Sequence, residues 1–496
     1  MTYLWSIKPK SYGGLHSLLS HHFVTRQLDI KINIISGGKT MKKSFITLVL
    51  VLILACAMIS STLAASYTAP AEQLSDLGLL RGVDGDFQLG RNPTRAEAVT
   101  MLVRFLGLEE EALAGDFEHP FTDLPDWAIP YISIAYELGY TTGVTDTLFD
   151  PTADCSAQMF VTFILRALGY SDDDAAGASL WSEAIDFGKK VGVVDDLLLS
   201  DEFLRGHMAA VSFLALFAEP AGAEYETLLG KLVADGVVSE DAAKLILEKL
   251  NMFNEFTLVG SELSSILNIA MTIDMNMDIT IAAMGVTESI SVFMDMKMTV
   301  DEDGIKYAIL TQQSAMGEDV TSEMYAVGDY IYINNNGDKS KMPVENSLGV
   351  SLSDLFTISS AAEMVNLSGY KIYSVNSIEK SEEDGLAVYS VELSGDAMNA
   401  AVSQSMGMMG ASDIGIVGDM TIGGMTIKAY ANEDGELVKA TLVYDGVISL
   451  MGAEMLFSIA MDIEITAKGD DVVIEFPDDL DDYAEIEEAV AAETAD

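Results

Sequence analysis

The chain has 496 residues, which is enough for roughly two to four domains. It carries 27 basic and 77 acidic residues, a formal net charge of −50, which excludes a nucleic-acid-binding protein because phosphates attract Lys and Arg. Its 49% hydrophobic content supports folded cores and argues against global disorder. The two cysteines are Cys56 and Cys155, and Cys56 lies in a segment that we expect to be removed, so no internal disulfide is predicted.

A secretory signal is predicted at residues 41–65. Met41-Lys42-Lys43 opens a positive segment, an apolar run extends from Phe45 to Ile59, and the small residues of 60–65 follow. Because such signals stand at an N-terminus, we interpret residues 1–40 as a mis-assigned upstream translation and predict that the protein starts at Met41. A competing interpretation is lipoprotein processing at Cys56, but the small residues that follow favour ordinary secretion.

A pattern recurs three times between residues 66 and 220, in copies covering about 66–115, 116–172 and 173–220. Each copy has two glycines four residues apart, then an apolar residue, then the start of a helix. The glycine pairs are Gly78 and Gly82, Gly139 and Gly143, and Gly188 and Gly192. A fixed repeat of this kind indicates one helical hairpin used three times, because a single unit cannot bury its own apolar face.

The helix starts carry capping signals. Thr94-Arg95-Ala96-Glu97 predicts a capping box in which Thr94 and Glu97 act structurally, and Ser156 is the corresponding cap of the second copy. The third copy keeps Arg205 after Leu204. We therefore expect a helix to begin at the same place in each unit.

Together with Phe121-Thr122-Asp123 and Trp127, these residues resemble the surface-layer homology family. The resemblance implies an all-α bundle of three repeats that binds secondary cell-wall polysaccharide non-covalently, often a polymer carrying pyruvate ketals. It places Arg95 and Arg205 at the family's arginine position, with Arg95 favoured as a ligand contact, and adds Asp123 and Trp127 as candidate polysaccharide-binding residues. Trp127 is alternatively a core residue, and Ala157 replaces the arginine of the second copy, so one groove is expected to be inactive.

The second half of the chain changes period. Residues 221–256 read as a helical connector, and residues 257–477 as an antiparallel β-rich domain because apolar and polar residues alternate there. The expected strands are Met271–Ile279, Val292–Val300, Tyr325–Ile333, Lys371–Ile378, Ala387–Leu393, Thr426–Ala431, Ala440–Tyr444, Phe457–Thr466 and Val472–Phe476, with turns at Asp384-Gly385 and Asp434-Gly435 and helices at Leu352–Val365 and Asp396–Met406.

This arrangement resembles the β-half-barrel of LolA/LppX lipoprotein carriers, with helices crossing one face. The resemblance implies an apolar concave face for a lipid or another hydrophobic ligand. Of the 27 methionines, 20 lie between Met271 and Met461, and flexible thioethers suit such a surface. Core filling by methionine is the alternative.

The predicted fold is therefore multidomain α + β, with an acidic, solvated tail at residues 478–496. No catalytic constellation, metal motif or cofactor motif is found, and only His119 and His207 remain after the signal segment, so the chain is not expected to be an enzyme. The predicted function is a secreted bacterial cell-surface protein anchored to the wall polysaccharide. The alternatives are a tethered lipid or hydrophobic-ligand binding protein and a structural or adhesive envelope component.

Overall fold

A computed structural model gives the architecture of the chain. It describes residues 67–82, 85–174, 179–199, 202–222, 224–261, 268–281, 285–301, 304–315, 317–343, 370–395, 420–450 and 453–485, together with 263, 266 and 367. The predictions for residues 1–40, the signal segment 41–65, Cys56, the helices 352–365 and 396–406, and the tail beyond 485 lie outside these residues.

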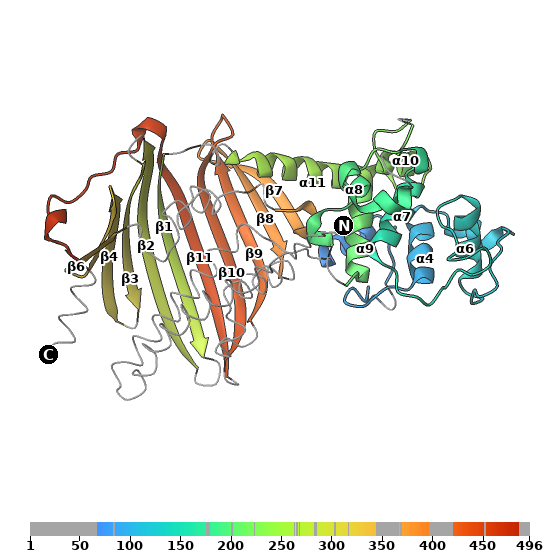
Figure 1. Cartoon of the computed structure of the whole chain (residues 1–496), viewed down its shortest axis with the longest axis horizontal. Coiled ribbons are helices and arrows are strands. Elements are labelled where there is room, and N and C mark those ends of the chain that lie inside the picture. Colours follow the sequence, from blue (N-terminus) through green and yellow to red (C-terminus); the bar gives the residue numbers. More distant parts are fainter. Residues whose placement is uncertain are drawn as a thin grey trace, which may run out of the picture.

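Helices form the N-terminal part and strands the C-terminal part, and Figure 1 shows them at opposite ends of an elongated molecule. The helices are α3 (Thr68–Asp76), α4 (Arg95–Phe105), α5 (Glu109–Ala114), α6 (Ile129–Glu137), α7 (Ala157–Ala167), α8 (Leu180–Val191), α9 (Arg205–Ala215), α10 (Leu228–Ala234) and α11 (Glu240–Leu258). Glycines with positive φ follow several of them, including Gly78, Gly139 and Gly192, where a left-handed residue closes the last turn.

The strands form a single sheet within the described residues. They are β1 (Ile269–Ile281), β2 (Val286–Asp301), β3 (Gly304–Ala315), β4 (Glu318–Val327), β5 (Tyr330–Asn335), β6 (Asp338–Pro343), β7 (Val375–Glu383), β8 (Leu386–Ser394), β9 (Met420–Ala431), β10 (Leu437–Leu450), β11 (Ala453–Lys468) and β12 (Ala484–Glu485). Their order is β12-β6-β5-β4-β3-β2-β1-β11-β10-β9-β8-β7, and every neighbouring pair is antiparallel except β12 with β6.

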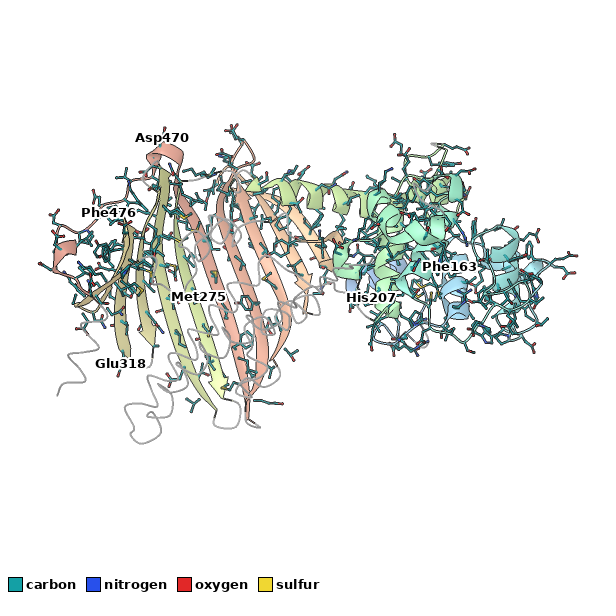
Figure 2. All side chains as sticks on the ribbon, in the orientation of Figure 1. Phe163, His207, Met275, Glu318, Asp470 and Phe476 are labelled. Carbon is teal, nitrogen blue, oxygen red and sulfur yellow. The ribbon has the colours of Figure 1, made fainter. Side chains whose placement is uncertain are left out.

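The alternation predicted for β1 is confirmed. Met271, Ile273, Met275, Met277 and Ile279 are buried, whereas the aspartates and asparagine between them are exposed. Met275 lies opposite Val292 of β2 and Met461 of β11, so the apolar positions of three central strands share one face, which we call the inner face. Figure 2 shows Met275 in the middle of the sheet.

Several strand predictions were wrong. β3 was missed because the polar Thr311 and Gln313 occupy apolar positions of its alternation, and the expected strand Tyr325–Ile333 is two strands separated by a turn at Gly328. Residues 371–374 enter β7 through a short 3₁₀ turn, η7 (Ile372–Ser374), and Val472–Phe476 is not a strand.

The expected solvated tail was also wrong for its first residues. Residues 478–485 fold back over β5 and β6, where Tyr483 is buried and its ring meets that of Tyr332 edge-on at 5.5 Å. Lys339 pairs with Asp479, and Ala484 pairs with Ser340 of β6. One aromatic residue in an acidic run is enough to bring this segment onto the sheet, because burying a ring removes much apolar area from water.

The two parts of the molecule meet at η7 and the start of β7. Lys249 of α11 donates hydrogen bonds to the carbonyl oxygens of Val375 and Asn376, at 2.8 and 2.9 Å. Gln73 of α3 donates to Val375 O at 3.3 Å. Burial lowers the pKa of Lys249 to about 8, which shows how far this contact excludes water. Figure 1 shows α11 running from the helical part to the β7 side of the sheet.

Candidate functional site: an arginine-lined groove

Three helices of the N-terminal part begin in the same way. α4, α7 and α9 each start after an extended residue, and these residues are Thr94, Ser156 and Leu204. Thr94 accepts a hydrogen bond from Glu97 N, while Glu97 accepts one from Thr94 N, and Ser156 accepts one from Met159 N. The first helical residues are therefore equivalent, and they are Arg95, Ala157 and Arg205.

Two of these helix starts bind the loop of another copy through the same backbone pattern. Arg95 N and Ala96 N donate to the carbonyl oxygens of Ala153 and Pro151. Arg205 N and the following Gly206 N donate in the same way to Arg91 O and Leu89 O. The loop of one copy thus binds the helix start of another, and these backbone contacts position the side chains of the two arginines.

Arg95 is enclosed by this arrangement. Its side chain is only 5% exposed, and it donates through Nε to Phe149 O at 3.0 Å and through Nη2 to Thr142 O at 3.2 Å. The guanidinium also lies 4.6 Å from the centre of the Phe149 ring. Arg95 therefore links two copies, and its expected contact with a polysaccharide stays a prediction.

Arg205 takes a different environment. Its Nε donates to Phe87 O at 3.1 Å, as Arg95 does to Phe149, but the side chain is half-buried and lines an open groove of about 210 Å³. The groove residues are Leu79, Leu80, Arg81, Arg91, Glu97, Thr100, Met101, Arg104, Trp127 and Arg205. Four of the seven arginines in the whole chain thus meet in one groove of a strongly acidic protein.

Carboxylates hold three of these arginines in place. Arg91 forms a two-pronged pair with Glu97, at 2.6 and 2.8 Å. Arg104 and Arg81 both pair with Glu109, at 2.8 and 3.3 Å. The hydrogen bonds from Arg91 lower the pKa of Glu97, so this carboxylate is ionised at neutral pH.

The fourth arginine, Arg205, has no carboxylate partner within the part of the chain that the structure describes. Burial, and then the positive charge of neighbouring Arg91, lower its pKa, whereas the charges of Glu97 and Asp86 raise it. Glu97 is held by Arg91, and among the described residues the Arg205 side chain binds only Phe87 O, so its guanidinium can accept an anion from outside the chain.

Of the other predicted residues, Trp127 lines the groove and Asp123 does not. Trp127 is 52% exposed, so the core interpretation of this residue is wrong. Both carboxylate oxygens of Asp123 accept backbone hydrogen bonds, from Phe149 N at 2.9 Å and Asp150 N at 2.8 Å. Burial alone would raise the pKa of Asp123, but these hydrogen bonds outweigh it and lower the pKa.

Sequence reasoning missed Arg81, Arg91 and Arg104 as groove residues. None of them occupies the position of Arg95 and Arg205, and the recurrence of Arg104 as Arg166 in the second copy indicated a repeated helix end and not a groove residue. A compositional signal was present, because six of the seven arginines lie between residues 81 and 205.

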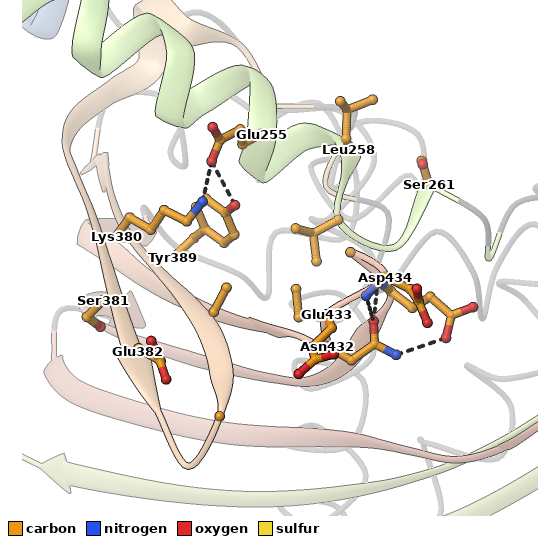
Figure 3. Close-up of a pocket in the computed structure, with 16 residues that line it drawn as sticks. Glu255, Leu258, Ser261, Lys380, Ser381, Glu382, Tyr389, Asn432, Glu433 and Asp434 are labelled. Carbon is orange, nitrogen blue, oxygen red and sulfur yellow. Dashed lines mark hydrogen bonds and ion pairs between the residues drawn. The ribbon is translucent and has the colours of Figure 1, made fainter.

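A second and larger hollow, of about 900 Å³, lies where the end of α11 meets the turns β7–β8 and β9–β10 (Figure 3). Glu255 accepts hydrogen bonds there from Lys380 and Tyr389, at 2.6 and 2.9 Å. Asn432 closes the β9–β10 turn by accepting from Glu436 N. These contacts lie within the fold, and those of Glu255 attach the end of α11 to the sheet.

Other reactive groups offer little chemistry. Cys155 is a free, buried thiol, and burial raises its pKa to about 12, so it is inert at neutral pH. Among the described residues no group of three or more His, Cys, Asp or Glu side chains is placed to hold a metal ion. In the same part of the chain, no helix combines the length and apolar character needed to cross a membrane.

Comparison with known proteins gives one family match and several relatives. Residues 259–443, a little over a third of the chain, match DUF6612, a family of unknown function. A cell surface protein of Thermoanaerobacter kivui is 33% identical over 156 residues, which cover 31% of this chain and 20% of that protein. A surface layer protein of Brevibacillus choshinensis is 35% identical over 109 residues, covering 21% and 10%, and a middle cell wall protein of Brevibacillus brevis is 34% identical over 119 residues, covering 22% and 11%. The chain thus spans a fifth or less of the length of these relatives.

Among solved structures, LprF from Mycobacterium bovis aligns with 46% of this chain and 97% of its own, at 14% identity and a TM-score of 0.24. At this level of similarity the sheet has to be interpreted from its own residues.

Proposed function

We propose that this protein is a bacterial cell-surface protein whose helical part binds an anionic secondary cell-wall polysaccharide non-covalently. The three matched helix starts and the surface-layer homology motifs support a repeat bundle of that family. The names of the relatives, which include a surface layer protein and a middle cell wall protein, support the location. On this proposal the sheet is the part that the anchor presents at the surface.

The environment of Arg205 is the observation that supports the proposal most directly. Its guanidinium lies in an open groove beside Arg91 and has no carboxylate partner among the described residues, although the chain has 77 acidic residues. A guanidinium presents a planar set of donors that matches a carboxylate, such as that of a pyruvate ketal. Trp127 at the same groove offers an apolar face for a sugar ring. The groove can therefore bind a charged substituent and its saccharide together.

The same residues support binding rather than catalysis. Arg91, Arg104 and Arg81 are held by Glu97 and Glu109, and these carboxylates are committed to ion pairs instead of being free to transfer protons. We infer that the helical part acts as an anchor and not as an enzyme.

The test is binding of the full-length secreted chain to purified cell walls. Arg205→Ala is expected to weaken binding about 10- to 100-fold, because a charged hydrogen bond contributes roughly 1.5–3 kcal/mol. Arg166→Ala is a control that removes an arginine outside the groove, at the place in the second copy that corresponds to Arg104. Removing the ketals from the walls should weaken binding of the unaltered protein about as much as Arg205→Ala does.

Equal retention of the two variants would contradict the assignment of Arg205. Retention of the unaltered protein on walls stripped of their polysaccharide would contradict the proposed function itself.

A second candidate function concerns the inner face of the sheet. Gln313 is buried there between Val292 and Val320, and its Nε2 has no hydrogen-bond partner among the residues that the structure describes. A buried amide without a partner costs about 1–3 kcal/mol, which a ligand with a carbonyl group would recover. This favours an apolar ligand that carries a hydrogen-bond acceptor, in keeping with a tethered lipid-binding protein.

Titration of the full-length chain with a fluorescent lipid analogue tests this second function. Saturable binding that weakens several-fold in Gln313→Leu would support it. Absence of saturable binding would leave the sheet as a structural or adhesive envelope component.

A further inference from the structure

The first turn of α9 carries the groove residue Arg205 and, two positions later, the buried His207. His207 Nδ1 accepts a hydrogen bond from Leu204 N at 2.9 Å. In α4 the same position is Glu97, which accepts from Thr94 N at 2.9 Å. His207 therefore takes the part of Glu97 in α9, while the part of Thr94 is missing because the side chain of Leu204 has no acceptor.

The other nitrogen of His207 meets a residue from the beginning of the described chain. His207 Nε2 lies 2.5 Å from the hydroxyl of Tyr67, and the two ring centres are 4.4 Å apart. Burial lowers the pKa of His207 to about 4, so the ring is neutral at neutral pH. Since Nδ1 accepts a hydrogen bond, the single proton of the neutral ring is on Nε2, which donates to the oxygen of Tyr67.

Tyr67 also packs on the residue between Arg205 and His207. A Cβ atom added to Gly206 would lie 2.5 Å from atoms of the Tyr67 ring. The glycine thus allows the ring to lie directly against the backbone of the turn. Tyr67 therefore contacts the two residues that follow Arg205 in the first turn of α9, Gly206 and His207.

The β part reaches Tyr67 from the opposite side. Tyr373 of η7 is fully buried and donates a hydrogen bond to Asp195 Oδ2 at 2.8 Å. The charge of Asp195 also raises the pKa of both Tyr373 and Tyr67, after burial itself. Figure 2 shows His207 on the side of the helical part that faces the sheet.

We propose that Tyr67 and His207 are positioning residues that hold the Arg205 turn in its binding geometry, and that Tyr373 of the β part completes this arrangement through Asp195. His207 is joined to Tyr67 and Tyr373 is joined to Asp195 by hydrogen bonds, and both α9 and α3 pack against η7. This inference rests on the proposed function of the groove. The binding affinity of the anchor then depends on how the sheet is attached to the helical part, although the sheet does not line the groove.

The experiment compares the affinity of full-length variants for soluble, ketal-bearing wall polysaccharide by calorimetry. Tyr67→Phe and Tyr373→Phe keep their rings and lose one hydroxyl each, and each is expected to weaken binding about 3- to 10-fold. Tyr170→Phe is the matched control, because its hydroxyl bonds Glu219 O at 3.0 Å in the helical part but outside the groove. The control should bind as the unaltered chain does.

Two variants of His207 separate its two contacts. Gln at the third helical position can still accept from the backbone N–H of the cap residue but loses the hydrogen bond to Tyr67, so His207→Gln should lose about as much affinity as Tyr67→Phe. His207→Leu loses both contacts and should bind more weakly than His207→Gln. Melting curves of each variant establish that the folded state is populated at the titration temperature.

The outcomes separate the two levels of the argument. Unchanged affinity in Tyr67→Phe and Tyr373→Phe, alongside weak binding by Arg205→Ala, would overturn the positioning proposal and leave the proposed function standing. Unchanged affinity in Arg205→Ala as well would overturn both.

Discussion

The first turns of α4 and α9 begin alike and end in opposite environments. Each has an arginine as its first helical residue, and each arginine donates through Nε to a carbonyl of another copy, Phe149 O or Phe87 O. Around Arg95 a second carbonyl and an aromatic ring close the site, whereas Arg205 opens onto a groove. The same position of the repeat therefore stabilises packing at Arg95 and is available to a ligand at Arg205.

The largest effect expected from this comparison is a loss of folding stability when Arg95 is replaced. Arg95→Ala should lower the free energy of unfolding by about 3 kcal/mol, because it leaves two buried carbonyl oxygens unpaired and a void beside Phe149. Arg205→Ala should change it by less than about 1 kcal/mol. Urea unfolding of both variants measures the difference, and a similar loss in both would break the contrast.

The pH dependence of the two turns should differ as well. The folded-state pKa of His207 is lowered to about 4, so as the pH falls from about 6.5 the unfolded chain takes up a proton before the folded chain does. Stability is complete above about pH 6.5 and should fall by about 3 kcal/mol by pH 4. Glu97 also has a lowered pKa, and its contribution is lost only below the ordinary pKa of a glutamate.

Melting curves of the unaltered chain and of His207→Gln between pH 7 and pH 4 check this prediction. The variant should lose the part of the dependence that lies above pH 4.5. A parallel pair of curves would mean that His207 does not cause it.

The second helical position offers a smaller contrast. Gly206→Ala should cost about 2 kcal/mol, because the added methyl group overlaps the Tyr67 ring. The equivalent residue of α4 is Ala96, which is buried with its methyl group in place. Thermal unfolding of Gly206→Ala beside Ala96→Gly measures both positions, and a harmless methyl group at 206 would show that Tyr67 is not held against the turn.

The smallest effect concerns the caps. Thr94→Ala should cost about 1 kcal/mol, the usual value for a lost N-cap hydroxyl. Ser156→Ala should behave similarly, because Ser156 caps α7 with the same geometry. Denaturant unfolding can detect the change, and an effect well below 0.5 kcal/mol in both would show that backbone contacts alone define these helix starts.

The sequence predicted the parts of this molecule that follow from local rules. The cap at Thr94 and the alternation through Met275 depend on neighbours a few residues apart, and both could be expected without a structure. The missed strand β3 shows the limit of such patterns, since Thr311 and Gln313 lie on the inner face although they are polar.

The groove could be predicted only in part. Arg205 and Trp127 were found through the repeat pattern, but Arg91 and Arg104 of the first copy share a groove with them only because the third and second copies pack against the first. The burial of Arg95 likewise depends on carbonyl groups that lie 47 and 54 residues further along the chain. Long-range packing of this kind decides which of two equal side chains is accessible, and no local pattern records it.

The segment that folds back over β5 and β6 has a consequence for crowded conditions. A sheet with free outer strands invites the same sheet in a neighbouring molecule to continue it. Here Ala484 and Glu485 occupy part of the outer side of β6, while Lys249 takes two carbonyl oxygens at the start of β7. Molecules packed side by side at high density would therefore meet with part of each outer strand already occupied, which hinders continuation of the sheet from one molecule to the next.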